Sequence, residues 1–248
     1  MEQVEYKKMR DHEEHYWWHK GKLHLVNSLY EKYFGGKQNL KILEIGCGTG
    51  EVMNLLKNWG DVYGVDYSKQ ALEFCRERGF TNVILGDFNT LDLSEHKDSY
   101  DLVLSLDVLE HIRDDVETMK RVFEILKPGG MFFVSVPAYK FLWSNHDEAL
   151  HHTRRYHSLE INQKIKDSGF EVVKSTHFVT ALFFPIAFVR LMSNFVRKTA
   201  YPKTSYFPLP TKVNDLFSGF LRFEAFLIKH FSLPVGTTLV VVAKKPGI

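Results

Sequence analysis

Short apolar runs alternate with segments of helical periodicity from residue 40 onward, as in α/β proteins built on a parallel sheet. The apolar runs predict five strands, at residues 40–45, 62–65, 82–85, 102–106 and 131–136. The segments between them predict helices at residues 51–58, 69–78 and 114–126. Lys127-Pro128-Gly129-Gly130 is expected to end the third helix and turn the chain into the fifth strand.

The second half of the chain departs from this simple alternation. Residues 159–168 predict a helix, and residues 170–178 and 237–243 predict two further strands. Between these strands, residues 179–233 show no clear strand and hold 12 of the 35 aromatic residues. Phe217, Phe220, Leu221 and Glu224 or Ala225 recur at helical spacing. The pattern therefore predicts a helical, aromatic-rich insertion before the last strand.

Composition and charge narrow the functional classes. The chain has 248 residues, 44% of them hydrophobic, which is enough for one sizeable core. Its net charge of only +2 argues against a protein that wraps nucleic acid by neutralising phosphates. The charge is uneven, with 23 basic and 28 acidic side chains in residues 1–178 but 9 and 2 in residues 179–248. We therefore expect the two regions to contact different partners.

Cysteine content, the N-terminal sequence and the apolar stretches indicate where in the cell the protein is expected. Cys47 and Cys75 are too few for a disulfide framework, which fits a reducing environment. The N-terminal sequence is too charged for a signal peptide. The most apolar stretch, residues 178–189, contains Pro185 and is shorter than the roughly 18 residues that span a bilayer. We expect a cytoplasmic protein without a transmembrane helix.

A glycine-rich loop, Glu44-Ile45-Gly46-Cys47-Gly48-Thr49-Gly50, directly follows the first predicted strand. Glycines let the backbone turn sharply and approach a ligand at a helix N-terminus. The spacing is G-x-G-x-G, not the G-x-G-x-x-G of a dinucleotide-binding loop, and the Glu44 carboxylate suits an ammonium group better than a pyrophosphate. By itself, such a loop is also compatible with a structural turn.

Two acidic residues at strand ends strengthen the ligand-binding interpretation. Asp66 lies about 20 residues after the glycine loop, where a carboxylate accepts hydrogen bonds from ribose hydroxyls. Asp87 follows the third strand and is placed to accept a hydrogen bond from an exocyclic amine. Either aspartate alone is more often a helix N-cap than a ligand-binding residue. Together with the loop, they predict a nucleoside site at the carboxyl edge of the sheet.

These segments resemble the class I S-adenosylmethionine-dependent methyltransferases over residues 40 to about 138. The resemblance rests on LEIGCGTG, VYGVDYS, LGDF, YDLVLSLDVLEHI and LKPGGMFFVSVP. It implies a seven-stranded, mostly parallel Rossmann-like sheet with helices on both faces, an antiparallel last strand, and S-adenosylmethionine as cofactor. The cofactor-binding residues that it implies are Glu44, Gly46, Cys47, Gly48, Asp66, Tyr67, Asp87, Phe88, Leu106 and Asp107. The long segment before the last strand departs from the short hairpin usual in the family.

The outer segments suggest a subgroup and a division of the chain. HEEHYWWHKGK and PAYKFLWSNHDEALHHTRRY are similar to a less characterised bacterial and archaeal subgroup, and distantly to the ubiquinone-biosynthesis O-methyltransferases. Trp17 and Trp18 are expected on a lid helix over the cofactor, with core packing as the alternative. The expected parts are lid helices at 1–38, a cofactor-binding core at 39–178, a helical cap insertion at 179–233 and the final core strand at 234–248.

Histidines near the expected site are candidates for proton transfer. A hydroxyl or ammonium acceptor must lose a proton during methyl transfer, and histidine titrates near neutrality. The candidates are His111 after the fourth strand and His146, His151 and His152 after the fifth. We expect His111 and His152 to be catalytic, although His111 is also compatible with backbone hydrogen bonding alone. Arg154 and Arg155 beside His152 suggest anion binding in the same loop.

A metal site is a further alternative. Asp107, Glu110, His111 and His152 are similar to the residues that hold magnesium in small-RNA 2′-O-methyltransferases, but aspartate replaces the first glutamate and shortens the reach. We therefore expect no metal. Ser105-Leu106-Asp107-Val108 also lacks the Asn/Asp-Pro-Pro-aromatic element that grips a nucleobase amine, so a nucleic-acid acceptor is not expected.

Together these features favour an S-adenosylmethionine-dependent methyltransferase for a small or lipid-like acceptor, at oxygen rather than nitrogen. The alternatives are an N-methyltransferase, a metal-assisted RNA 2′-O-methyltransferase, a nicotinamide-dependent oxidoreductase, and a non-enzymatic, membrane-associated adaptor. Peripheral membrane contact through the insertion and an ordinary solvated cap stay equally open. The residues concerned are Phe183, Phe184, Phe188 and Phe195, interleaved with Arg190, Arg197 and Lys198. The sequence does not indicate an oligomeric state.

Overall fold

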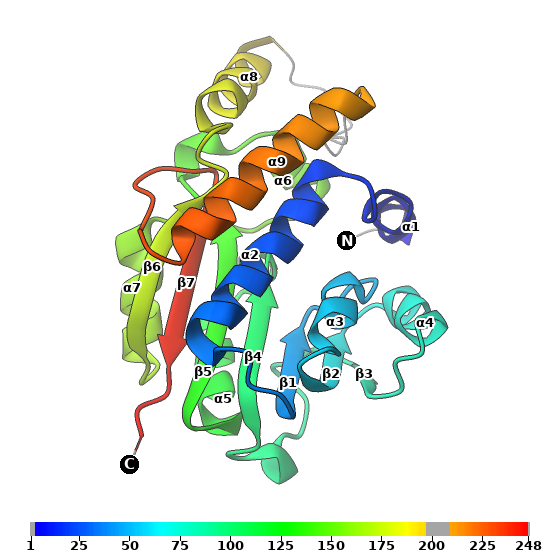
Figure 1. Cartoon of the computed structure of the whole chain (residues 1–248), viewed down its shortest axis with the longest axis vertical. Coiled ribbons are helices and arrows are strands. Elements are labelled where there is room, and N and C mark those ends of the chain that lie inside the picture. The colour runs from blue at the N-terminus through cyan, green and yellow to red at the C-terminus, as the bar shows by residue number, and fades with distance from the viewer. Residues whose placement is uncertain (1–2, 197–208, 248) are drawn as a thin grey trace.

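A seven-stranded sheet forms the centre of the computed structural model, which describes residues 3–196 and 209–247 (Figure 1). The strand order is β3-β2-β1-β4-β5-β7-β6, and β7 is antiparallel to both of its neighbours. The strands are β1 Leu40–Ile45, β2 Gly60–Asp66, β3 Val83–Leu85, β4 Tyr100–Leu106, β5 Leu126–Pro137, β6 Glu171–Phe178 and β7 Thr238–Lys244. The predicted seven-stranded, mostly parallel sheet with an antiparallel last strand is therefore confirmed.

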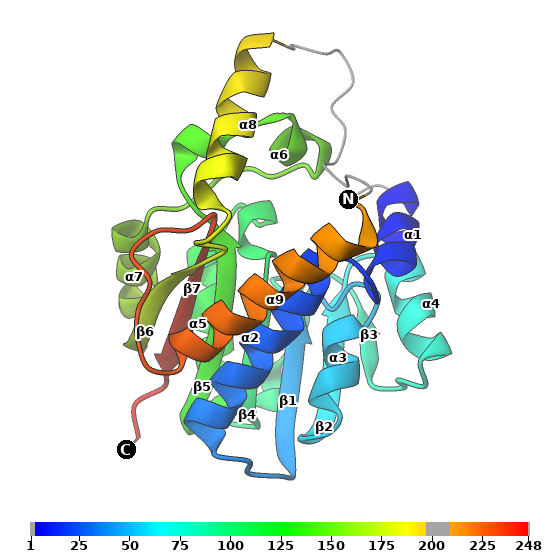
Figure 2. The ribbon, with the colours of Figure 1, turned by 45° about the horizontal axis from the view of Figure 1, so that its top comes forward.

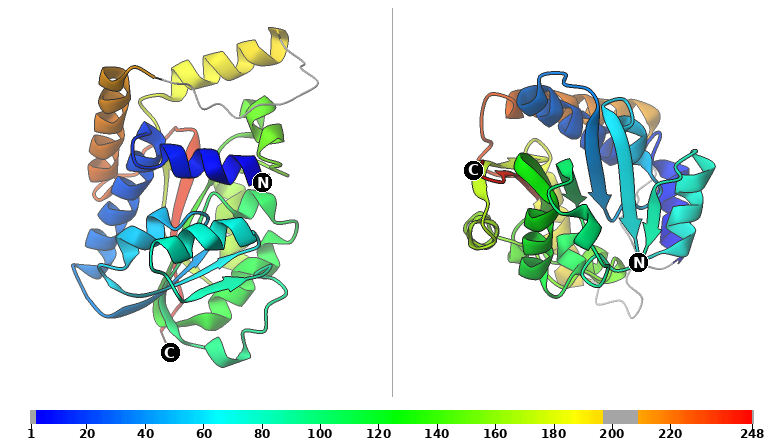
Figure 3. Two further views of the ribbon diagram at one scale, coloured as in Figure 1. Left: turned by 90° about the vertical axis from the view of Figure 1, so that its right-hand side faces the viewer. Right: turned by 90° about the horizontal axis from the view of Figure 1, so that it is seen from below.

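Helices cover both faces of the sheet (Figure 3). The helices are α1 Gln3–His12, α2 Trp17–Phe34, α3 Glu51–Leu56, α4 Lys69–Glu77, α5 Asp115–Ile125, α6 Asn145–Ala149, α7 Ser158–Asp167, α8 Phe183–Val196 and α9 Thr211–Ile228. Side chains of α2, α3, α4 and α9 pack on one face, and those of α5 and α7 on the other. Strand β7 has apolar side chains on both faces, so helices must bury both. Val240 and Val242 pack in the core on the face covered by α2 and α9, while Leu239 and Val241 pack in the core on the face covered by α5 and α7.

The turn between α5 and β5 differs from its prediction. Strand β5 begins at Leu126, directly after the helix, and Lys127–Gly130 form a bulge within the strand rather than a connection before it. The register shows the bulge, because Tyr100 pairs with Leu126 whereas Leu102 pairs with Met131. Gly129 at φ +80° makes the bulge, and its N–H donates to the carbonyl of Lys245. The chain beyond β7 thus provides the hydrogen bonds that keep this segment in the sheet.

The amphipathic helix predicted around Phe217 is present as α9, which runs beside α2 (Figure 1). Its inner face buries Leu221, Ala225 and Ile228 in the main core. The two helices approach closely at Gly21, where a Cβ would lie 2.2 Å from Leu221 Cδ1. Helix α9 is therefore part of the main body, while the division of the chain into lid, core and cap remains a prediction.

Helix α8 lies apart from the sheet, beyond the carboxyl ends of the strands (Figure 2). Buried Glu224 of α9 anchors the chain that leads into it, accepting hydrogen bonds from the N–H groups of Thr180 (2.9 Å) and Ala181 (2.6 Å). Among the helices of the described residues, none has the length and hydropathy needed to cross a membrane.

Candidate active site

A cavity of about 1020 Å³ lies at the carboxyl edge of the sheet. Small-molecule sites commonly measure about 300–1,000 Å³, so this volume suits a nucleoside cofactor together with a second molecule. All ten residues predicted to bind the cofactor line it: Glu44, Gly46, Cys47, Gly48, Asp66, Tyr67, Asp87, Phe88, Leu106 and Asp107. His111, His146 and His152 line it as well, whereas His151 is exposed and is not among the lining residues. The fold thus brings predicted residues from Glu44 to His152 to one cavity.

The glycine loop is held tightly against the neighbouring strand. The N–H groups of Gly46 and Cys47 both donate to the carbonyl of Val65, at 2.7 and 3.1 Å. Gly46 has φ +69°, and a Cβ there would lie only 2.4 Å from Val108 Cγ2. Glycine is therefore required at position 46 for backbone conformation and for space.

Asp66 is buried at the end of β2, and its carboxylate ties the loop together. It accepts hydrogen bonds from the N–H groups of Gly48 and Ser68, both at 2.9 Å, and from the Tyr6 hydroxyl at 3.4 Å. Burial raises the pKa of Asp66, and these donors partly oppose the increase. Tyr6 belongs to α1, so the N-terminal helix reaches the acid that is predicted to hold the ribose.

Asp87 and Phe88 lie on the adenine side of the predicted site. One Asp87 oxygen accepts a hydrogen bond from the N–H of Asn89 at 2.9 Å, so part of this carboxylate caps a local turn. The Phe88 ring is buried, and the guanidinium of Arg121 lies 5.8 Å from its centroid. Both the capping and the ligand-binding interpretations of Asp87 are compatible with this geometry.

Glu44 carries the observation that fits a bound cofactor. Its side chain is buried, it lines the cavity, and its Oε2 atom has no hydrogen-bond partner. Burial raises the pKa of Glu44 well above its ordinary range. A buried carboxylate oxygen without a partner is costly, and an ammonium group from a ligand would satisfy it. The residues present therefore fit the amino-acid end of S-adenosylmethionine.

Lys22 is a site residue that the sequence analysis missed. Its Nζ lies 2.8 Å from Asp107 Oδ2 and 5.7 Å from the centroid of the Trp18 ring. Burial alone would lower the pKa of Lys22, but Asp107, Glu51 and Glu44 together raise it above its ordinary value. A charged lysine therefore enters the carboxylate-rich end of the cavity. The sequence feature that could have identified Lys22 was its position four residues after Trp18, which places both side chains on the same face of the helix.

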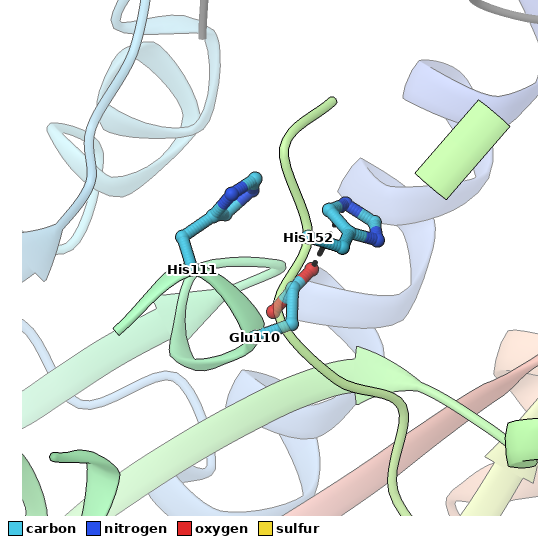
Figure 4. Close-up of side chains that lie close together, drawn as sticks. All are labelled: Glu110, His111 and His152. Carbon is cyan, nitrogen blue, oxygen red and sulfur yellow. Dashed lines mark ion pairs between the residues drawn. The ribbon is translucent and has the colours of Figure 1, made fainter. Parts of the chain in front are cut away.

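Glu110 and His111 follow β4 and lie near His152, as Figure 4 shows. The ring centroids of His111 and His152 are 4.8 Å apart at an interplanar angle of 81°, and His152 Nε2 lies 3.8 Å from Glu110 Oε1. Burial lowers the pKa of His111 to about 4. Glu110 is fully buried, neither of its oxygens has a hydrogen-bond partner, and burial raises its pKa well above the usual range. His152 therefore lies beside a neutral His111 and a buried Glu110 whose carboxyl oxygens have no hydrogen-bond partner.

Asp147 holds His152 in place, with Oδ1 2.9 Å from His152 Nδ1. The same carboxylate accepts hydrogen bonds from the Ser144 N–H (2.9 Å) and from Arg155 Nε (2.8 Å). Arg190 of α8 pairs with it at 3.6 Å. Burial would raise the pKa of Asp147, but these partners hold it below its ordinary value. An ionised Asp147 only accepts, so His152 donates to it through Nδ1–H, while Nε2 faces Glu110.

The arginines beside His152 are held by partners within the protein, and the anion binding suggested by the sequence stays a prediction. Arg155 is buried on Asp147 and also donates to the carbonyl of Ala138 at 2.8 Å. Arg154 pairs with Asp115 at 3.1 Å and donates to the carbonyl of Arg113 at 2.7 Å. Both guanidinium groups therefore stabilise the loop. The sequence did not predict this role, because it depends on partners that only the fold brings close.

Three residues of the metal alternative converge. One ligand atom each from Glu110, His111 and His152 lies within 4.8 Å of the others. The fourth residue, Asp107, is turned toward Lys22 and accepts a hydrogen bond from Ser135 Oγ at 3.1 Å. The geometry therefore leaves a three-ligand metal site as an alternative to a metal-free histidine base.

Apolar side chains of α2, α8 and α9 and of the segment before α8 form part of the cavity wall. They are Trp17, Leu182, Pro185, Ile186, Val189 and Phe217. Trp17 meets Phe217 edge-on, with centroids 5.7 Å apart, and both tryptophans also pack against the core. Trp17 and Trp18 thus pack on the core, as the alternative predicted, and also line the cavity, while their role as a lid over the cofactor stays a prediction. We call this apolar part the chamber.

The buried histidines predict a pH-dependent loss of stability. Burial lowers the pKa of His111 and His146 from 6.5 to about 4. Between these values the unfolded chain binds more protons, so stability falls as pH falls through this window, by up to about 3 kcal/mol for each histidine. Urea unfolding at pH 7 and pH 5 should show His146→Gln losing less stability than the wild type. The exposed His15→Gln is the control, and parallel losses in all three proteins would contradict the prediction.

Comparison with known proteins identifies the fold family. The family model described as a methyltransferase domain matches residues 36–199. A protein of Mycolicibacterium smegmatis named probable S-adenosylmethionine-dependent methyltransferase is 29% identical over 163 residues, covering 64% of this chain and 61% of the relative. A ubiquinone biosynthesis O-methyltransferase of a Shewanella species is 31% identical over 122 residues, covering 46% and 52%. The matches thus span about half to three fifths of these relatives.

A solved structure supports the same fold along almost the whole chain. A methyltransferase from Haloferax volcanii, in complex with the Trm112 methyltransferase activator, has a TM-score of 0.62 at 21% identity, covering 99% of this chain and 94% of its own. Together with the glycine loop and the strand-end acids, the family match settles the assignment: this chain belongs to the methyltransferase domain family, within the class I S-adenosylmethionine-dependent methyltransferases.

Proposed function

We propose that this protein transfers the methyl group of S-adenosylmethionine to a hydroxyl group of a small or lipid-like acceptor. The observation that carries the proposal is the Asp147–His152 pair, whose histidine lines the same cavity as the cofactor motifs and the apolar chamber. When bound, S-adenosylmethionine supplies a methyl group that is activated by the sulfonium centre. The protein must then align the acceptor, exclude water and receive one proton.

The cofactor would be held by residues at four strand ends. Glu44 would pair with the ammonium group, Asp66 would accept hydrogen bonds from the ribose diol, and Phe88 would pack against the adenine. Lys22, which pairs with Asp107 and lines the cavity, would lie on the side of the carboxylate of the methionine portion. These roles use residues that already line one cavity.

His152 is the proposed general base. Asp147 fixes the Nδ1–H tautomer, so Nε2 is free to take the acceptor's proton as the oxygen–methyl bond forms. His111 packs edge-on against the His152 ring and limits its rotation. A hydroxyl acceptor suits this arrangement, because its proton must leave as the methyl group arrives. Transfer to nitrogen is the alternative.

The chamber favours an acceptor with a large apolar part. Trp17, Ile186 and Phe217 supply aromatic and aliphatic surface in the cavity that His152 also lines. Such walls would bury a ring or a hydrocarbon chain while its hydroxyl group faces the histidine. Quinol precursors and hydroxylated lipids have this chemistry, and the sequence relationship to a ubiquinone biosynthesis O-methyltransferase supports the first of these classes.

Calorimetry and a methyl-incorporation screen would test the proposal. We expect S-adenosylmethionine to bind with measurable heat and NAD not to bind, and labelled methyl groups to enter components of a quinol-precursor or lipid extract. Absence of heat with S-adenosylmethionine would refute the proposal. Binding without methyl incorporation into any quinol, lipid or sugar extract would instead support a non-enzymatic cofactor-binding adaptor.

Metal-assisted transfer is the second candidate, and the convergence of Glu110, His111 and His152 favours it. A divalent cation there would lower the pKa of a bound acceptor hydroxyl. Under the leading proposal, prolonged treatment with a chelator should leave turnover unchanged within about twofold, since His152 alone takes the proton. A large loss that added Mg²⁺ or Mn²⁺ restores would shift the assignment to the metal-assisted reaction.

A further inference from the structure

Exposed apolar side chains gather on α8 and α9. Among the described residues, ten of the fifteen exposed large apolar side chains lie on these two helices or on the turn after α9. They are Phe184, Phe188, Val189, Leu191 and Met192, followed by Leu216, Phe220, Phe223, Phe226 and Phe231. We call this set the aromatic patch. The concentration of ten such residues on two helices and one turn sets them apart from the scattered exposed apolar residues found on most protein surfaces.

The patch follows helical spacing on both elements. On α8, Phe184 and Phe188 are 74% and 66% exposed and lie one turn apart. On α9, Leu216, Phe220 and Phe223 recur at intervals of four and three residues. The opposite face of α9 is already buried in the core. Helix α9 is therefore apolar on two faces, whereas a helix that faces only water is polar on the outside.

The charge around the patch selects its partner. Residues 183–231 contain seven basic and two acidic side chains. Among the described residues of this segment, Lys212 and Arg222 of α9 are exposed, Glu224 is buried and Asp215 pairs with Lys20. Arg190 and Lys229 pair with Asp147 and Glu31, so the charge beside the patch is modestly positive. A second copy of this chain would place the same positive charge against itself. An anionic surface would be attracted instead, and bulky apolar residues mixed with lysine and arginine are typical of segments that lie in the interface of an anionic bilayer.

We propose that the aromatic patch of α8 and α9 binds the surface of an anionic lipid bilayer. Both helices lie beyond or beside the strand ends that form the cavity, with α8 projecting from the body (Figures 2 and 3). The bilayer interface would bury phenylalanine side chains that water now contacts. The binding is peripheral, because the apolar faces are short stripes on helices that otherwise pack on the protein.

The patch is continuous with the chamber. Val189 is 55% exposed and also lines the cavity, and Pro185 and Ile186 on the same helix line it too. A bilayer on the patch would therefore meet the chamber at α8, and an acceptor with a hydrocarbon chain would reach His152 without crossing water. This part of the inference rests on the proposed function, whereas membrane binding itself does not require methyl transfer.

Vesicle sedimentation of the full chain would test the inference. We expect binding to vesicles of phosphatidylcholine with phosphatidylglycerol, weaker binding to phosphatidylcholine alone, and weakening by salt. The double variants F184Q/F188Q and F220Q/F223Q should each reduce partitioning at least about tenfold, because each removes two anchoring rings. L159Q, which changes an exposed leucine (75%) on α7, is the matched control and should bind like the wild type.

Circular dichroism and S-adenosylmethionine calorimetry would confirm that the variants are folded, and the calorimetry tests the methyltransferase proposal separately. Wild-type protein that stays in the supernatant with both vesicle types would overturn the inference, as would double variants that bind like the wild type. A dimer in light scattering that F220Q/F223Q converts to a monomer, without vesicle binding, would assign the patch to a second copy of the chain.

Discussion

Replacing Asp66 with alanine is expected to weaken S-adenosylmethionine binding by about a hundredfold or more, since hydrogen bonds to a charged group contribute about 1.5–3 kcal/mol each. The buried carboxylate is placed to accept hydrogen bonds from both ribose hydroxyls. It also accepts hydrogen bonds from the N–H groups of Gly48 and Ser68, and the variant leaves these donors without their acceptor. Calorimetry with S-adenosylmethionine measures the change directly.

Two further variants make the Asp66 result specific. Asp61 lies on the same strand but is exposed, so Asp61→Ala should bind the cofactor like the wild type. Asp66→Asn preserves the shape while removing the charge, and its binding should fall between those of the wild type and Asp66→Ala. Wild-type affinity in Asp66→Ala would show that this carboxylate only shapes the loop.

Replacing His152 with alanine is expected to leave cofactor affinity within about threefold while slowing methyl transfer by about 10²–10⁴-fold, the usual contribution of a general base. The cofactor motifs lie on β1, β2 and β4, whereas His152 is held by Asp147 and faces the chamber. The comparison requires calorimetry for binding and initial rates at saturating cofactor for turnover.

Asp147→Asn distinguishes positioning from catalysis. Asparagine can donate as well as accept, so the His152 tautomer is no longer fixed, and we expect a slower rate with unchanged cofactor affinity. His157→Ala, at an exposed histidine on the same loop, is the control, and it should keep the wild-type rate and cofactor affinity. Equal losses of cofactor binding in Asp66→Ala and His152→Ala would refute the division of roles between the two residues.

The sheet and the cofactor site were predictable because their signals are local. Strand β1 has the predicted bounds, since a run of apolar residues followed by glycines marks both of its ends. Asp66 and Asp87 lie at the carboxyl edge because parallel strands all end there. Lys22 and Asp147 escaped prediction for the opposite reason. Their roles come from contacts with Asp107 and His152 that only the folded chain creates.

The spacing of apolar residues was least informative for the insertion before β7, because it could not tell buried from exposed faces. The spacing of Phe217 and Leu221 correctly predicted a helix, but it did not indicate which stripe of α9 is buried, because both stripes are apolar. Of the residues considered for membrane contact, Phe183 is buried and Arg190 turns inward to Asp147. The side chain of Phe195, and Arg197 and Lys198 entirely, lie outside the described residues.

The position of β7 constrains the order in which the sheet forms during synthesis. Strand β7 follows β6 in the chain, yet it lies between β5 and β6 and pairs with both. A nascent chain can therefore assemble β1 to β5 while still on the ribosome, but β6 has no strand to join until β7 has emerged. The cofactor motifs precede this point, whereas β6 joins the sheet only together with β7.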